Sequence, residues 1–143
     1  ARMSGSDVSP AALALARKNA RLHGLDVTWL RADALSGVIG PFDLLLSNPP
    51  YLPSADRACA PPELSFDPAL ALYSGPDGLE LARRLCRDAP RVLAEGAPLL
   101  LELDPRNVRV LAAELRAQGW HTRIFPDLNG QERFLRANLS DSA

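Results

Sequence analysis

The sequence predicts an α/β fold built on a mostly parallel sheet, and three observations support this prediction. Short apolar runs alternate along the chain with longer segments of helical periodicity, which is the pattern of strand–helix–strand units. Two of these runs, residues 42–47 (FDLLLS) and 99–103 (LLLEL), are apolar enough for strands covered on both faces. Residues 108–115 repeat apolar side chains at i, i+3, i+4 and i+7, as an amphipathic helix does.

The N-terminal part is expected to contribute a helix and a strand. Ser9 followed by Pro10 is a favourable helix start, because Ser can cap backbone N–H groups and Pro fits the first turn. Gly24 is expected to end this helix, and residues 27–30 (VTWL) form the next strand candidate. Helical spacing places five residues along one face: Ala12, Leu15, Ala16, Asn19 and Leu22.

The middle of the chain is predicted to leave a strand and enter a long irregular segment. The strand at 42–47 stops at Asn48, where two prolines follow. Residues 52–76 are rich in proline, and irregular segments of this length inside a compact domain are usually functional. A helical pattern resumes near Gly78, and Pro90 is expected to kink or split that helix.

The C-terminal part is predicted to hold a strand, a helix and two further strands. The strand at 99–103 leads into a helix that ends at Gly119. Residues 120–125 and 133–139 are the last strand candidates. Because no internal repeat or linker is visible, residues 1–143 are expected to form a single domain.

Bulk composition describes a soluble globular protein. The chain is 47% hydrophobic with a formal net charge of -1, so it lacks the basic character typical of nucleic-acid-binding proteins. Cys59 and Cys86 form no CxxC pair and have no neighbouring His, so we expect free thiols and no metal. No apolar run reaches membrane-span length, and the first residues do not resemble a signal peptide. We therefore expect a cytoplasmic protein without a membrane or direct nucleic-acid partner.

The most specific chemical signal is Asn48-Pro49-Pro50-Tyr51, which stands at the exit of an apolar strand. In open α/β sheets, ligands bind beyond the carboxyl ends of the strands. The Asn48 side-chain oxygen and the Pro49 carbonyl can each accept a hydrogen bond, and the double proline restricts the direction of that carbonyl. The Tyr51 ring offers a flat wall for a planar group.

These groups suit N-methylation of an amide. An amide nitrogen is a weak nucleophile because its lone pair is delocalised into the carbonyl. Two acceptors on its N–H bonds would orient the nitrogen and stabilise the positive charge that it gains during attack, without a dedicated base. The simpler alternative is an ordinary Asn-Pro turn that ends a strand. The position of the motif at a predicted strand end favours the functional interpretation.

This motif and several other segments resemble the HemK-type protein-(glutamine-N5) methyltransferases, class I S-adenosylmethionine-dependent enzymes that modify peptide chain release factors. The block at 66–80 distinguishes this family from the adenine- and cytosine-directed enzymes that share NPPY. The resemblance covers nearly the whole chain and includes SDVSPAALALARKNA (6–20), RAD (31–33), SNPPYLP (47–53), FDPALALYSGPDGLEL (66–81), LLLEL (99–103) and DLNGQERFL (127–135).

The resemblance implies a three-layer Rossmann-like methyltransferase fold, with a mostly parallel sheet and an antiparallel C-terminal strand. It also implies that Asn48, Pro49, Pro50 and Tyr51 bind the target amide. Asn48, Pro49 and Tyr51 would be the catalytic members of this set. Phe66, in a segment that matches a family motif, would help to shape the substrate channel.

The resemblance further implies three residues that bind the cofactor S-adenosylmethionine. Asp7, at the end of a strand, matches the acid that binds the ribose hydroxyls, and Asp33 matches the acid near the adenine amino group. Asn48 would contact the cofactor as well as the substrate. From the residues alone, Asp7 is equally well explained as a helix-start residue beside Ser9, and Asp33 as a solvated loop acid.

One family feature has no counterpart in the sequence. Nothing resembles the glycine-rich loop that follows strand 1, because SGS at 4–6 leads into Asp7 on a strand instead of opening a helix. We therefore expect the chain to begin within strand 2 of the fold. Strand 1, the glycine-rich loop and the N-terminal recognition helices would then be missing, and the sequence would be a fragment or an incomplete copy of a longer enzyme.

The predicted reaction is methyl transfer from S-adenosylmethionine to a glutamine side-chain nitrogen of a protein, with S-adenosylhomocysteine as the product. A release factor is the expected substrate. The first alternative is N-methylation of an exocyclic amine of adenine or cytosine, which the near-neutral charge and the 66–80 block disfavour. The second is a truncated, non-catalytic protein, which the absent glycine-rich loop favours for the chain as given.

Overall fold

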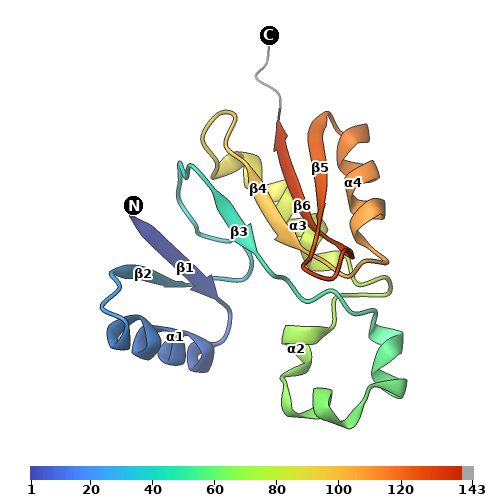
Figure 1. The fold of residues 1–143 in the computed structure, drawn as a ribbon. Coiled ribbons are helices and arrows are strands. Elements are labelled where there is room, and N and C mark those ends of the chain that lie inside the picture. The colour runs from blue at the N-terminus through green and yellow to red at the C-terminus, as the bar shows by residue number, and fades with distance from the viewer. Residues whose placement is uncertain (140–143) are drawn as a thin grey trace. The chain divides into compact units, whose positions relative to one another are not determined.

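The computed structural model describes residues 1–139, apart from the side chain of Ser65, and the chain divides into two compact units at residue 40 (Figure 1). The first unit consists of β1 (Met3–Asp7), α1 (Pro10–Leu22) and β2 (Val27–Arg31). Its two strands pair in parallel, and the helix connects them. This is a strand–helix–strand unit, as the alternating pattern predicts.

Local chemistry explains the start and end of α1. The Ser9 hydroxyl accepts a hydrogen bond from the backbone N–H of Ala12 at 3.3 Å, and Pro10 occupies the first turn. Gly24, with φ of +64°, lets the chain leave the helix in a left-handed conformation. The predicted boundaries of this helix are therefore confirmed.

The predicted apolar face of α1 is wrong. Leu15 and Leu22 are 59% and 72% exposed, whereas Leu13 and Ala20 are buried. Both sets obey helical spacing, because Leu13 and Ala20 are also seven residues apart. Only packing on the β1–β2 pair decides which set is covered.

The SGS segment lies within β1, as the sequence predicts. Gly5 pairs with Trp29 of β2, and a Cβ atom on Gly5 would overlap the Trp29 ring. The glycine therefore makes room for a cross-strand aromatic side chain, and it does not form part of a phosphate-type loop.

The second unit contains a four-stranded sheet in the order β3-β4-β6-β5. β3 (Leu45–Ser47) and β4 (Leu99–Glu102) are parallel, whereas β6 (Glu132–Leu139) is antiparallel to β4 and to β5 (Trp120–Pro126). The antiparallel C-terminal strand is therefore confirmed. Two parallel pairs, β1–β2 and β3–β4, account for the parallel character of the chain.

Helices cover one face of this sheet. α4 (Val108–Ala117) packs on β5 and β6, and α3 (Glu80–Asp88) lies on the same side (Figure 1). Pro90 separates α3 from a short 3₁₀ helix, η3 (Ala89–Arg91), so the predicted split is confirmed. Nine aliphatic side chains, none more than 1% exposed, form the centre of the core: Leu79, Val92, Leu99, Leu101, Leu103, Val108, Leu111, Leu115 and Leu135.

Two predictions about the middle of the chain are wrong. Leu44 and Leu46 are 48% and 74% exposed, so the strand before the NPPY motif is not buried on both faces. β3 lies at the edge of its four-stranded sheet. Residues 52–76 are not irregular throughout, because they contain three short helices: η1 (Ser54–Cys59), η2 (Pro62–Phe66) and α2 (Ala69–Leu72).

Candidate active site

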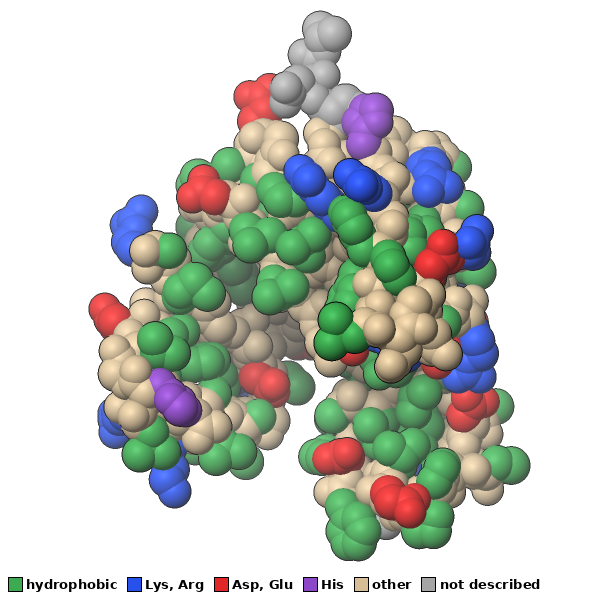
Figure 2. Space-filling view, in the orientation of Figure 1, with side chains coloured by type: hydrophobic (Ala, Val, Ile, Leu, Met, Phe, Trp, Pro, Cys, Tyr) green, Lys and Arg blue, Asp and Glu red, His purple; other side chains and the backbone are tan. Residues whose placement is uncertain are grey.

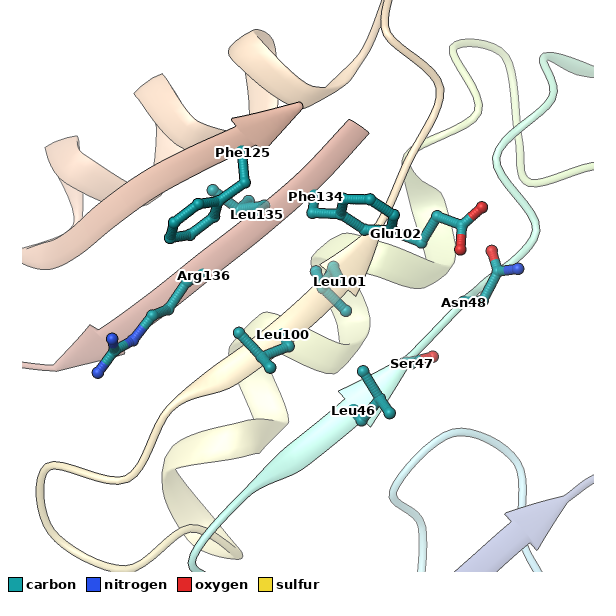
Figure 3. Close-up of a pocket in the computed structure, with 10 residues that line it drawn as sticks. All are labelled: Leu46, Ser47, Asn48, Leu100, Leu101, Glu102, Phe125, Phe134, Leu135 and Arg136. Carbon is teal, nitrogen blue, oxygen red and sulfur yellow. The ribbon is translucent and has the colours of Figure 1, made fainter. Parts of the chain in front are cut away.

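The NPPY motif follows directly on β3, at the carboxyl end of the strand. Asn48 is exposed and Pro49 is buried. The motif borders a hollow of about 730 Å³ on the face of the sheet opposite α3 and α4 (Figure 3). The following residues line the hollow: Leu46, Ser47, Asn48, Leu100, Leu101, Glu102, Phe125, Phe134, Leu135 and Arg136.

The hollow has an apolar floor and polar groups at its margin. Figure 3 shows Glu102 and Asn48 projecting near each other at the carboxyl ends of β4 and β3. Figure 2 shows hydrophobic side chains gathered on the surface over β3 and β4. The carboxyl ends of parallel strands are where α/β sheets bind ligands. Asn48 therefore lies where an amide-binding group is expected.

Two hydrogen bonds hold the peptide unit that ends the motif. The Tyr51 carbonyl accepts from the side-chain amide of Asn107 at 3.1 Å, and the Leu52 N–H donates to the Leu72 carbonyl at 2.9 Å. Asn107 is 8% exposed and stands at the start of α4. Sequence reasoning missed this residue, because only the tertiary fold brings it to the motif.

The 66–80 block packs against the segment that follows the motif. Ser74 donates its backbone N–H to the Leu52 carbonyl at 3.0 Å, and Ser54 donates its backbone N–H to the Gly75 carbonyl at 2.8 Å. The Ser54 hydroxyl reaches the same carbonyl at 3.0 Å. The block that resembles the glutamine methyltransferases thus fixes the chain immediately after NPPY.

Ion pairs tie the neighbouring turns together. Arg106 contacts Asp104 at 3.0 Å and Asp56 of η1 at 3.1 Å. Burial raises the pKa of Asp104, but hydrogen bonds from Arg106 outweigh burial, so the net pKa of Asp104 lies below its usual value. Arg83 joins Glu114 of α4 at 2.8 Å and Asp77 at 2.7 Å. Hydrogen bonds from Arg83 and from the backbone of Leu79 lower the pKa of Asp77.

The structure places Asp7 and Asp33 at one edge of the first unit. Asp7 is the last residue of β1, and Asp33 lies two residues beyond the end of β2. Because β1 and β2 are parallel, both carboxylates lie beyond the carboxyl ends of neighbouring strands. One Asp7 carboxylate oxygen accepts the backbone N–H of Ser9 at 2.7 Å, so the predicted helix-start role is observed. Two exposed acids at a strand edge also fit the hydroxyls and amino group of a nucleoside.

Phe66 and the cysteines do not join the hollow. Phe66 ends η2, is 89% exposed and is not among the residues that line the hollow; its role in a substrate channel stays a prediction. Cys59 and Cys86 are both free, as expected. Burial raises the pKa of the Cys86 thiol to about 12, so this group is not a nucleophile. Within the described residues there is no cluster of metal ligands, and no helix is long and apolar enough to cross a membrane.

The chain is similar to known methyltransferases. Residues 1–60 match the methyltransferase small domain family. The chain is 57% identical to the release factor glutamine methyltransferase of Deinococcus radiodurans, over 96% of the chain and 49% of that protein. It is 42% identical to the ribosomal protein uL3 glutamine methyltransferase of Xanthomonas campestris, over 71% of the chain and 33% of that protein. The chain thus spans about half or less of the length of these relatives.

A solved structure supports the fold. The ribosomal protein L11 methylase of Lactobacillus delbrueckii has a TM-score of 0.69 at 16% identity, and the match covers 98% of this chain and 58% of that one. With this neighbour, the α/β architecture and the strand-end motif define a class I methyltransferase fold. Within that class, the chain belongs to the HemK-type glutamine methyltransferase family, because its similarity to those proteins covers nearly its whole length.

Proposed function

We propose that the protein that carries this chain transfers a methyl group from S-adenosylmethionine to a glutamine side-chain amide of another protein. Residues 1–143 supply a single catalytic domain in this proposal, although the structure divides into two compact units. The observation that carries the proposal is the NPPY motif at the carboxyl end of β3, with its last peptide unit held by Asn107 and Leu72.

The residues of the motif orient the amide. Asn48 and the Pro49 carbonyl accept hydrogen bonds from the two amide N–H groups, and Tyr51 packs against the amide plane. These acceptors stabilise the positive charge that grows on the nitrogen, so their effect is larger in the transition state than in the bound substrate. When bound, S-adenosylmethionine supplies an electrophilic methyl group on a sulfonium centre. Asp7 and Asp33 hold its nucleoside end.

A release factor is the proposed substrate, because the relative from Deinococcus radiodurans bears that name and is 57% identical. Ribosomal protein uL3 is a second candidate, since the Xanthomonas campestris relative named for it is 42% identical over 71% of the chain. Both candidates present a glutamine amide, so the same motif serves either reaction.

The test is methylation of defined substrates. The chain, alone and fused to the N-terminal half of the Deinococcus radiodurans relative, is incubated with S-adenosylmethionine and a release factor, uL3 or an adenine-containing oligonucleotide. Peptide mass spectrometry should locate one added methyl group on a glutamine. Methylation of the oligonucleotide alone would replace the proposal with amine methylation, and no transfer by an otherwise folded fusion would refute it.

Calorimetry with S-adenosylmethionine separates cofactor binding from catalysis. We expect the 143-residue chain to bind more weakly than the micromolar range, about -8 kcal/mol, because Asp7 and Asp33 contact only the nucleoside end. The fusion should bind more tightly. Micromolar binding by the chain alone would contradict this expectation.

A further inference from the structure

We propose that Asn107 is a positioning residue for the NPPY motif, acting through the Tyr51 carbonyl. This inference rests on the proposed function, because the motif is the proposed amide-binding group. Asn107 does not touch the hollow; it fixes the backbone that presents the motif.

Asn107 stands at the start of α4 but does not cap the helix. Its backbone already has helical φ and ψ angles, and its side chain makes no cap hydrogen bond. Asp104 caps this turn instead: its carboxylate accepts the Arg106 backbone N–H at 2.8 Å, and its carbonyl accepts the Val108 N–H at 3.1 Å. The Asn107 side chain is therefore not needed as a cap, and it donates to the Tyr51 carbonyl at 3.1 Å.

The backbone on both sides of that bond is restricted. Pro49 and Pro50 each fix their own φ and restrict the residue that precedes them. After Tyr51, both polar atoms of the next peptide unit are bonded: the carbonyl to Asn107, and the Leu52 N–H to the Leu72 carbonyl. These two bonds fix the C-terminal end of the motif, and the pairing of Ser47 with Leu101 of β4 fixes the strand that precedes it. Such restriction is what orientation of a weak nucleophile requires.

A glycine packs against the same carbonyl. Gly78 is buried, and a Cβ atom there would overlap the Tyr51 carbonyl oxygen and lie 2.8 Å from the Asn107 side-chain nitrogen. Its φ of +80° further favours glycine. Gly78 belongs to the 66–80 block, so this contact gives a physical reason for a glycine in that block.

Arg106 connects the same turn to the chain beyond the motif. It contacts Asp56 of η1 at 3.1 Å and Asp104 at 3.0 Å. The turn before α4 therefore contacts the motif through Asn107. Through Arg106 it contacts η1, the helix that follows the motif in the sequence. Each contact joins residues that are 50 or more positions apart in the sequence.

Hydrogen exchange on the 143-residue chain tests the positioning role without any need for activity. In Asn107→Ala, the amides of Leu52 and Ser74 should exchange roughly tenfold faster, as expected when a buried hydrogen bond is lost. Amides of β4 and β6 should keep their protection. Asn107→Gln retains a carboxamide donor and should recover most of the protection, and Asn138→Ala, a matched change in β6, should leave Leu52 and Ser74 unchanged.

Two exchange results overturn the proposal. Unchanged exchange at Leu52 and Ser74 in Asn107→Ala means that the bond does not hold the segment. Equal acceleration throughout the sheet means that Asn107 contributes only general stability. Neither result depends on glutamine methylation, so failure of this inference is distinguishable from failure of the proposed function.

Steady-state kinetics of the same variants in the active fusion then tests the consequence for catalysis. Asn107→Ala should lower kcat by roughly 10- to 100-fold, the effect of a small displacement of a positioning group. The KM for S-adenosylmethionine should stay unchanged, and Asn107→Gln should restore most of kcat. An unaltered kcat despite faster exchange at Leu52 would show that catalysis does not need the fixed backbone.

Discussion

The NPPY motif and Asp7 of the first unit differ in the contacts that hold them in place. Two prolines, the Asn107 amide and the 66–80 block surround the motif. Asp7, in contrast, lies at the end of a two-stranded sheet whose strands are mostly exposed, and its carboxylate accepts a hydrogen bond from the Ser9 backbone N–H. A two-stranded sheet is only marginally stable by itself in water.

This difference matches the demands of the two proposed tasks. Activation of an amide requires acceptors fixed to within a fraction of an ångström, because the rate depends steeply on geometry. Binding of ribose hydroxyls by a carboxylate tolerates more movement, since it contributes affinity and not bond making. Within the described residues, the proposed amide-binding motif is thus fixed by more hydrogen bonds than the Asp7 carboxylate.

The largest expected effect separates the two regions directly. In the active fusion, Asn48→Ala should lower kcat by about 100- to 1,000-fold, equivalent to roughly 3–4 kcal/mol of transition-state stabilisation, with little change in cofactor affinity. Asp7→Ala should weaken cofactor binding, and at saturating cofactor it should lower kcat less than Asn48→Ala does. Tyr51→Phe should be milder than Asn48→Ala, because the ring is kept. Steady-state kinetics and cofactor titration check each variant, and the reverse pattern for Asn48 and Asp7 would exchange their roles.

A comparison of two helix leucines tests where the packing energy lies. Leu111 of α4 is 1% exposed, so Leu111→Ala should lower the free energy of unfolding by about 2–5 kcal/mol. Leu15 of α1 is 59% exposed, and Leu15→Ala should change the free energy of unfolding by no more than about 0.5 kcal/mol. Urea unfolding followed by far-UV circular dichroism, which reports the helices of both units, measures both. An equal loss of unfolding free energy in the two variants would mean that Leu15 is buried in solution.

Acid should weaken the turns of the second unit. The pKa of Asp104 is lowered in the folded state. The ionised Asp104 carboxylate therefore stabilises the fold fully above its unfolded pKa of about 4, and this stabilisation is lost as the pH falls through its folded pKa. Asp104→Asn should therefore lower stability at about pH 7 and reduce the further loss at about pH 3. Urea titrations at both pH values give the result, with the exposed Asp43→Asn as control. An unchanged acid dependence in Asp104→Asn would assign the effect to other carboxyl groups.

The smallest effect concerns a hydroxyl in β5. The buried Thr122 Oγ1 has no hydrogen-bond partner among the described residues. Thr122→Val keeps the shape and removes the unsatisfied oxygen, so it should raise the free energy of unfolding by about 1 kcal/mol. Thr28→Val, an exposed change in β2, is the matched control. A loss of stability in Thr122→Val would indicate that water or a neighbouring group satisfies the hydroxyl.

The sequence by itself determined the local elements and the nature of the motif. Ser9 with Pro10 sets the start of α1, Pro90 splits α3 from η3, and the spacing from Val108 to Leu115 defines the buried face of α4. These features depend on caps, fixed φ angles and short-range periodicity. The NPPY motif could likewise be recognised from its residues and from the apolar strand before it.

Only the tertiary structure decided which surfaces are covered and what holds the motif. Leu44 and Leu46 are as apolar as Leu99 and Leu101 of β4, yet they are 48% and 74% exposed, and Leu46 lines the open hollow. Asn107 has no neighbour in the sequence that links it to the motif, but its side chain meets Tyr51 after a separation of 56 residues. Periodicity and capping rules act over a few residues, whereas edge position and long-range hydrogen bonds depend on how distant segments pack, which no local pattern specifies.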